Sequence, residues 1–373
     1  MQSIIERTKL RDFDWVTAGL AVTITLFGSW MISLALPTEP LWQKQLIGLA
    51  IALVAFLVVS FSDYRRIVDA APIFYGLSLL LLVLVLVPGL GVKVNGQTAW
   101  LRFPIIGQFQ PSEFAKVPAV LMLARYFGRR KSGPLRLREF MIGLGILALP
   151  VGLILLEPDA GQAITYFPLL GAVLFLSGVK VRYVLITVAA ALIFVPASYW
   201  IGVKTGKIKP YQQERINVII DPESADPRGY GYHTVQSMIT VGRGGVVGIV
   251  GESDTSQAKL KFLPEPQTDF IFAVTAENTG FIGCLALLIA YGVLLTRLIS
   301  GARGASDRSG MLVVMSITVG MTFQIFMNMG MVLGFLPVIG VPLPLMSAGL
   351  SAVLATFIAL GFGISVKIRR FVN

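Results

Sequence analysis

Long apolar segments separated by short polar breaks recur from one end of the chain to the other. Most approach the ~20 residues that a helix needs to cross a bilayer core of ~30 Å. The pattern predicts an all-α polytopic membrane protein with about ten transmembrane helices, of which the fourth is short and carries charge. The predicted segments are 15–36, 46–62, 70–90, 112–127, 140–156, 164–179, 183–203, 270–296, 310–335 and 344–366.

Lysine and arginine positions predict the orientation of these segments. With the N-terminus in the cytoplasm, 19 basic residues fall in the inside segments and three, Lys44, Lys93 and Arg102, in the short outside loops. An even number of spans also returns the basic C-terminus to the cytoplasm. The net charge of +11 is then explained by contact with anionic lipid, so nucleic acid is not an expected partner.

One long connection joins the predicted seventh and eighth helices. Residues 204–269 are too rich in glycine and polar residues to span a membrane, and the topology places them outside the cell. Loops of this length are commonly functional. The chain shows no internal repeat and no soluble domain, so residues 1–373 are expected to form one membrane domain with one large extracytoplasmic loop.

Composition excludes several classes of protein. Hydrophobic residues make up 55% of the chain and charged residues 14%, whereas a soluble domain carries about a quarter charged residues. Cys284 is the single cysteine and His233 the single histidine. One chain therefore has neither a disulfide framework nor a thiolate or multi-histidine metal site.

Ionisable residues in an apolar span are costly and need a reason. Glu113 and Lys116 open the fourth span at i, i+3, on one helix face, with Ser112 as a possible N-cap. Two interpretations stay open. The pair is either a neutralised ion pair that fastens helices, or the lining of an outward-facing cavity where Lys116 meets an anionic ligand.

A second polar site ends the fifth span. Pro158 and Gly161 interrupt the helix there, so Asp159 is expected on an irregular turn at the outer membrane surface. This turn is either a polar hairpin between two spans or the position of a carboxylate that faces the same cavity as Glu113.

The segment 262–274 places Asp269 at the outer boundary of the eighth span. Thr268 and Asp269 could form a plain helix N-cap. However, the aromatic and apolar residues that follow would desolvate the carboxylate and make it more basic. Glu277 falls on nearly the same helix face, about 12 Å deeper. Two carboxylates along one face suggest a polar groove, which is the typical setting of a general base beside a membrane-embedded substrate.

Two further segments contain candidate binding residues. Three prolines and several glycines interrupt the outer ends of the last two spans over 328–349, where freed amides could bind phosphate oxygens or form only a tight turn. His233 lies in the long loop and is either a hydrogen-bonded structural residue or a catalyst. The glycines of 242–245 do not fit a phosphate loop.

Taken together, these segments resemble the SEDS family of shape, elongation, division and sporulation proteins, which includes RodA and FtsW. The resemblance extends over nearly the whole chain, and family members have ten transmembrane helices with a large outer loop between the seventh and the eighth. Residues 256–265 and the short N-terminus are most similar to the RodA branch. The matching motifs are 109–116, 157–161, 221–224, 231–237, 263–274 and 340–347.

The resemblance implies a peptidoglycan glycosyltransferase that joins lipid II units on the outer face of the bacterial cytoplasmic (inner) membrane, for cell elongation and rod shape. A sugar 4-hydroxyl would attack an anomeric carbon with inversion, and undecaprenyl diphosphate would leave. Asp269 matches the family's essential aspartate, the proposed general base. Lys116, or a divalent cation such as Mg or Mn, could stabilise the leaving diphosphate. The expected substrate-binding residues are Glu113, Lys116, Asp159, His233, Glu277 and Ser347.

The resemblance also implies protein partners, and at several positions the sequence differs from the family's usual residues. The expected partners are a class B penicillin-binding protein, which is a transpeptidase, and other membrane proteins of the elongation complex. Gln267 replaces a usual histidine, Asn278 a frequent second glutamate, and Ala348 and Leu350 a usual tyrosine and glycine. Ala99 stands where a basic residue is common. These departures question any mechanism that uses the missing histidine or tyrosine.

Two other functions are compatible with the sequence. A lipid II flippase would also need intramembrane charges and broken helices. However, Glu113, Asp159 and Asp269 all lie toward the outer face, which favours chemistry at that face. A scaffold that only recruits other wall enzymes would leave these carboxylates without a purpose.

Overall fold

The computed structural model describes residues 11–94, 97–103, 107–130, 133–206, 230–249, 256–260 and 262–370, and this part of the chain is mainly helical. All ten predicted segments contain a helix, which confirms the all-α polytopic class. The helices are α2 (Trp15–Ala35), α3 (Leu41–Phe61), α4 (Tyr64–Asp69), α5 (Ala71–Leu86), α6 (Pro111–Gly128), α7 (Leu137–Leu156), α8 (Ala160–Ile164), α9 (Tyr166–Leu176), α10 (Val181–Lys204), α12 (Tyr230–Arg243), α13 (Ile271–Arg303), α14 (Arg308–Val332) and α15 (Leu350–Ile368).

Six of the described helices, α2, α3, α7, α13, α14 and α15, are long and apolar enough to cross a membrane. Two shorter apolar stretches, α5 and the continuous pair α8–α9, add to them. The chain is therefore a multi-pass membrane protein, while the number of ten spans stays a prediction.

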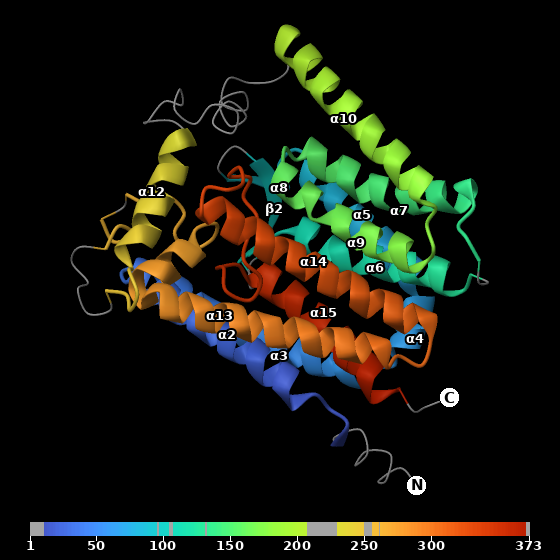
Figure 1. The fold of residues 1–373 in the computed structure, drawn as a ribbon, viewed down its shortest axis with the longest axis horizontal. Coiled ribbons are helices and arrows are strands. Elements are labelled where there is room, and N and C mark those ends of the chain that lie inside the picture. The colour runs from blue at the N-terminus through green and yellow to red at the C-terminus, as the bar shows by residue number, and fades with distance from the viewer. Residues whose placement is uncertain are drawn as a thin grey trace.

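The helices form two groups that meet at α6 and α14. In Figure 1, α2, α3, α13 and α15 make up one side of the bundle and α5 to α9 the other, while α10 leans away from both. Helix α14 packs against α6, α9 and α13, and α15 packs against α3. Glycines permit close approach, as in other helix pairs in lipid. A Cβ on Gly361 of α15 would lie 3.0 Å from the Phe56 carbonyl of α3.

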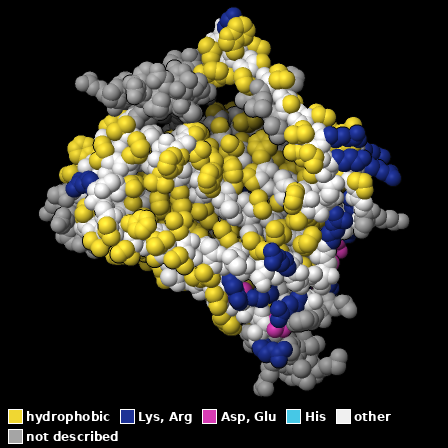
Figure 2. All heavy atoms as spheres, in the orientation of Figure 1, with side chains coloured by type: hydrophobic (Ala, Val, Ile, Leu, Met, Phe, Trp, Pro, Cys, Tyr) yellow, Lys and Arg dark blue, Asp and Glu magenta, His cyan; other side chains and the backbone are white. Residues whose placement is uncertain are grey.

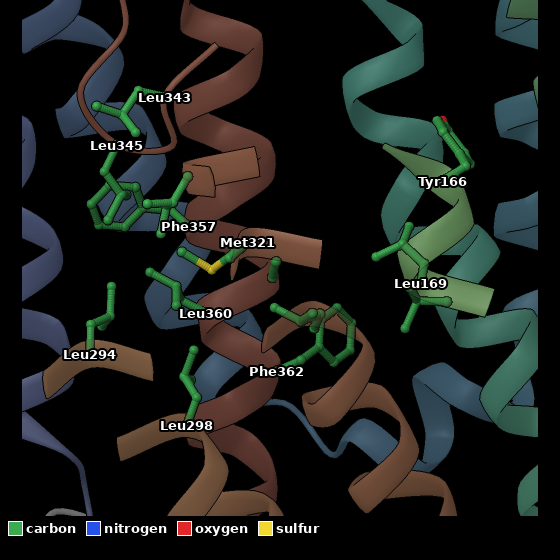
Figure 3. Close-up of a cluster of buried hydrophobic side chains, with 14 of the residues drawn as sticks. Tyr166, Leu169, Leu294, Leu298, Met321, Leu343, Leu345, Phe357, Leu360 and Phe362 are labelled. Atoms are coloured by element: carbon green, nitrogen blue, oxygen red, sulfur yellow. The ribbon is translucent and has the colours of Figure 1, made fainter. Parts of the chain in front are cut away.

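The outer surface of the bundle is apolar and the core is filled by branched and aromatic side chains. Figure 2 shows hydrophobic side chains over most of one face, with Lys and Arg gathered toward the end where both termini lie. This distribution agrees with the predicted charge asymmetry. In the core, Leu294 and Leu298 of α13 lie in one buried cluster with Phe357 and Leu360 of α15 (Figure 3).

A small antiparallel sheet, which the hydrophobic pattern did not predict, joins α5 to α6. Its strands are β1 (Gly91–Val94), β2 (Gln97–Phe103) and β3 (Gly107–Phe109), in the order β1-β2-β3. Only Gln110 separates β3 from helix α6, which begins at Pro111. Proline fits this first helical position because the N–H that it lacks is not needed there. The sheet thereby fixes where Glu113 enters the bundle.

The last span and the long outer loop differ from the predictions. The last span was expected from residue 344, but α15 begins only at Leu350, because residues 344–348 form turns and bends. The long outer loop contains a helix, α12, and residues 256–257 of this loop contact α13. The matching motif at 221–224 lies outside the described residues.

A buried charge cluster joins three helices at the end of the bundle that carries both termini. Asp14, the N-cap of α2, is 4% exposed and accepts hydrogen bonds from Arg297 of α13 (2.8 Å) and from Lys367 of α15. Burial alone would raise the pKa of Asp14, but these bonds and the Thr17 amide lower it to about 2. The folded chain therefore favours the charged carboxylate, so this contribution to stability is present above pH 3.8 and is lost as the pH falls toward 2.

We expect Asp14→Asn to lower the free energy of unfolding by about 2 kcal/mol, because the charge-assisted bonds are lost, with part of the effect screened at the half-exposed Arg297. The measurement is thermal unfolding of the purified protein in detergent at pH 7. Asp69→Asn is the matched control, since the Asp69–Arg129 pair is more than half exposed. Equal stability of both variants would contradict a structural role for the cluster.

Candidate functional site

Three turns that connect transmembrane segments meet at one end of the bundle. Residue Gly161 lies so close to the turn before α15 that an added Cβ would be 2.1 Å from the Ile339 carbonyl oxygen. A Cβ on Gly340, in that same turn, would lie 3.5 Å from Oδ2 of Asp269. The turn that carries Asp159 and the turn that carries Asp269 are therefore both packed on residues 339–340.

The backbone around Asp269 is held by α14 and by the turn that leads from α14 to α15. Three successive carbonyls accept hydrogen bonds: Gln267 from the Ala348 amide (2.8 Å), Thr268 from the Ser347 hydroxyl (2.6 Å) and Asp269 from the Asn328 side chain (2.9 Å). Each of these carbonyls precedes α13 and has no partner within that helix. The segment before α13 is thus fixed residue by residue.

Asp269 itself is partly buried and is followed by an apolar wall. Phe270 is 1% exposed and Ile271 is fully buried. The N-cap of α13 is Phe270, so the N-cap position predicted for Thr268 and Asp269 was wrong. The desolvating environment expected from the sequence is present.

Glu113, Lys116 and Asp159 belong to one hydrogen-bonded network. Lys116 Nζ lies 2.7 Å from Glu113 Oε2, and Gln162 links the pair to α8 by donating to Glu113 Oε1 (2.6 Å) and accepting from Lys116 (3.3 Å). Asp159 accepts hydrogen bonds from the backbone N–H of Gln162 (3.0 Å) and from the side-chain amide of Gln110 (3.0 Å). The ion pair therefore fastens α6 to α8, as the first of the two interpretations expected.

The same ion pair lines a cavity, so the second interpretation also has support. The cavity lies between α6, α9, α14 and α15 and is partly open to its surroundings. Apolar side chains form most of the wall, and the polar lining residues are Glu113, Lys116, Thr165, Gln324 and Thr356.

Ser347 and His233 lie close to the Asp269 segment in different ways. Ser347 is buried, and its hydroxyl accepts from the Leu343 amide (2.8 Å) while it donates to Thr268. His233 lies on α12, with its ring centroid 6.3 Å from that of Phe270. Ser347 thus stabilises the turn before α15, and His233 lies beside the apolar wall that begins at Phe270. A direct role of either residue in substrate binding stays a prediction.

Glu277 contacts the outer loop. It is fully buried and accepts from Ser256 Oγ (2.9 Å) and the Gln257 amide (2.8 Å), with Arg243 at 3.9 Å. These contacts hold residues 256–257 and the end of α12 against α13. The polar groove expected along α13 is thus occupied at Glu277 by the protein's own loop.

A break in α13 lies next to Glu277. Gly280 has φ +63°, and the amides freed there are satisfied by the loop: Phe281 donates to the Gly245 carbonyl (2.9 Å) and Ile282 to the Val246 carbonyl (3.1 Å). A Cβ on Gly248 would lie 2.1 Å from the Asn278 carbonyl oxygen. The glycines in and after 242–245, which did not fit a phosphate loop, therefore allow a close backbone contact with the broken helix.

Glu157 is a buried carboxyl just beyond the end of α7. Both of its oxygens lack a hydrogen-bond partner within the described part of the chain. Burial and the nearby Asp159 carboxylate raise the pKa of Glu157 to about 8. At neutral pH Glu157 therefore carries a proton and adds no charge to the site.

No group of three or more His, Cys, Asp or Glu side chains that could hold a metal ion lies within the described residues. The divalent cation considered from the sequence stays a prediction.

The sequence pattern did not single out three side-chain amides: the buried Gln162 and Asn328 and the partly buried Gln110. Each bridges segments that are far apart in the sequence, and no local pattern marks them. Gln162 directly follows the Pro158–Gly161 break, and Asn328 opens the Pro- and Gly-rich element, so proximity to these breaks is the only available signal.

The raised pKa of Glu157 predicts a pH-dependent stability. The folded chain binds this proton more tightly than the unfolded chain, so stability should fall as the pH rises from 4.5 to 8, on the order of 3–5 kcal/mol. Thermal unfolding in detergent at pH 5, 7 and 9 measures this fall. Glu157→Gln removes the titration and should unfold with less dependence on pH; an identical pH dependence in both proteins would contradict the assignment.

The glycine contact with α13 predicts a second effect. Gly248→Ala places a Cβ against the Asn278 carbonyl, and should detach the loop from α13 and make residues 244–260 more sensitive to limited proteolysis. Gly89→Ala is the matched control, because Gly89 also has a positive φ (+88°) but open space around it. Cleavage at the same rate in both variants would show that the contact does not hold the loop.

Comparison with known protein families gives an independent result. The model of the FtsW, RodA and SpoVE family, described as cell cycle proteins, matches residues 12–372. The peptidoglycan glycosyltransferase MrdB of Escherichia coli is 37% identical over 88% of this chain and 85% of its own length. Stage V sporulation protein E of Bacillus subtilis is 32% identical over 88% and 87%.

Solved structures agree with these sequence relatives. A chain from a peptidoglycan synthase complex, described for its coordination of polymerization and crosslinking, has a TM-score of 0.81 and 34% identity over 97% of this chain and 99% of that one. The rod shape determining protein RodA of Thermus thermophilus has a TM-score of 0.71 and 28% identity over 97% and 98%. The fold is thus shared over nearly the whole length.

Proposed function

The chain belongs to the FtsW, RodA and SpoVE family, and on this premise we propose that Asp269 is the general base with which it polymerises lipid II. The peptidoglycan glycosyltransferase activity expected from the sequence is confirmed, because relatives with this activity match most of the chain. The residues that perform the reaction and its lipid-linked substrate are the subject of the proposal.

In the proposed reaction, Asp269 accepts the proton of a sugar 4-hydroxyl while the oxygen of this hydroxyl attacks the anomeric carbon of a second lipid II. The new glycosidic bond forms as the bond from this carbon to the diphosphate breaks. Undecaprenyl diphosphate then leaves with the electron pair. A positioned base of this kind contributes about 10²–10⁴-fold to the rate.

The observation that carries this proposal is the convergence of the three turns. Asp269 lies against Gly340, the Asp159 turn packs on the same residues, and its network leads through Gln162 to Lys116 at the cavity. A carboxylate and a cation are thereby connected through one rigid set of contacts. This arrangement supports a base at one end and an anion-binding group at the other.

Lys116 is the proposed contact for the diphosphate. Its ammonium group has three N–H donors, of which Glu113 and Gln162 occupy two. The third can donate to a phosphate oxygen, while the apolar cavity wall suits the start of a polyprenyl chain. Because Glu113 balances the charge of Lys116, the ammonium group binds the diphosphate mainly through directed hydrogen bonds.

The proposed setting is the outer face of the bacterial cytoplasmic membrane, with both termini in the cytoplasm. The basic end of the bundle then faces anionic lipid, in agreement with the positive-inside rule. A class B penicillin-binding protein is the proposed partner, since the similar chain of 0.81 TM-score comes from a complex that polymerises and crosslinks. Similarity to MrdB and RodA favours the elongation branch.

A purified-component assay tests the base. Polymerisation of lipid II is measured for the native chain and Asp269→Asn, each with its transpeptidase partner. We expect a rate at least 10²-fold lower in the variant, because proton removal is lost. Asp69→Asn is the control and should retain the native rate, since Asp69 lies in an exposed ion pair at the opposite end of the bundle.

The same assay distinguishes the flippase alternative. If the native chain with partner makes no glycan but labelled lipid II crosses liposomes, the polymerase assignment is wrong and the transporter takes its place. A folded Asp269→Asn variant that polymerises at the native rate would instead leave the activity intact and remove Asp269 as its base.

A further inference from the structure

Asn328 connects helix α14 to the two turns that surround the proposed base. It is fully buried, and its side-chain nitrogen donates to the Asp269 carbonyl (2.9 Å) and to the Val341 carbonyl (2.8 Å). Both neighbours are acceptors, and an amide NH₂ has two donors. The orientation of the Asn328 amide is thus determined by its contacts.

The other half of the Asn328 amide indicates what the residue is for. Its Oδ1 is buried and has no hydrogen-bond partner among the residues that the structure describes. An unsatisfied buried oxygen is unfavourable, and a leucine of similar size would avoid it. The packing of this position therefore does not explain an asparagine, whereas its two N–H donors do.

The bond to Asp269 acts on a carbonyl that α13 cannot satisfy. The helix begins after its N-cap, Phe270, so the Asp269 carbonyl lies before the first helical hydrogen bond, which Val274 makes to Phe270. The contact with Asn328 defines the peptide plane on the C-terminal side of Asp269 and hence the direction of its Cβ. The second bond holds Val341, whose neighbour Gly340 lies against the Asp269 carboxylate.

We propose that Asn328 is a positioning residue that sets the direction of the Asp269 carboxylate by binding the carbonyl of that same residue. The inference rests on the proposed role of Asp269 as general base. Ser347 and Ala348 hold the two preceding carbonyls, but Asn328 alone of the three contacts residue 269 itself. A displacement of about 1 Å in a catalytic group can lower a rate by 10²-fold.

Steady-state kinetics of lipid II polymerisation, with the transpeptidase partner present, test the proposal. Asn328→Leu removes both donors without adding charge, and we expect kcat to fall 10- to 100-fold while KM for lipid II stays within twofold. Thr318→Val is the matched control: Thr318 is equally buried on α14, but its hydroxyl bonds to Val314 within the helix. This control should retain native kcat and KM.

A second variant covers the case in which Asn328→Leu does not fold. Asn328→Ala also removes both donors without adding charge, and it should show the same fall in kcat at unchanged KM. Protein yield and thermal unfolding are measured in parallel for all variants.

The outcomes separate this inference from the proposed function. A folded Asn328 variant that keeps kcat within twofold of Thr318→Val, or that changes only KM, overturns the positioning role, provided that Asp269→Asn is inactive. If Asp269→Asn is active at the native rate, the proposed base fails, and the positioning role fails with it. A fall in kcat for Asn328 variants together with an inactive Asp269→Asn supports both.

Discussion

The site depends on one constraint, which is that polar backbone at membrane depth must find its hydrogen bonds inside the protein. The segment before α13 has no helix of its own to satisfy it, and the carbonyls of Gln267, Thr268 and Asp269 are instead bound by α14 and by the turn that leads to α15. The position of Asp269 thus follows from the hydrogen bonds that its own backbone needs. A chain segment that must be bound at every residue has little freedom to place its side chains elsewhere.

The same constraint explains what could be predicted from the sequence. Helices in lipid form their backbone hydrogen bonds internally, and each of the ten segments predicted from apolar length contains a helix. The orientation predicted from the lysines and arginines agrees with the basic end of the bundle. Asp269 stood out because an acidic residue before Phe270 and Ile271 contradicts the local pattern. The resemblance to the family was confirmed by relatives over nearly the whole chain.

What the sequence did not reveal are contacts between distant segments. Asp269 lies just before α13 and Glu277 within it, and their spacing suggested one polar groove. The outer loop, however, returns to bind Glu277, which local spacing cannot reveal. Asn328 and Gln162 were missed for the same reason, since a buried amide has no periodic signal. The segment 341–349 shortened α15 because two prolines, Pro342 and Pro344, and Gly349 act together there.

The break at Gly280 divides α13 into two parts. The part after the break is anchored to α2 through Arg297 and Asp14, whereas the part before it, roughly 14 Å long, begins at the segment that carries Asp269. The loop contacts both parts, at Glu277 before the break and at Phe281 and Ile282 after it. Lipid offers no acceptor to the two amides that the break frees, so the chain's own loop takes the place that water would fill in a soluble protein.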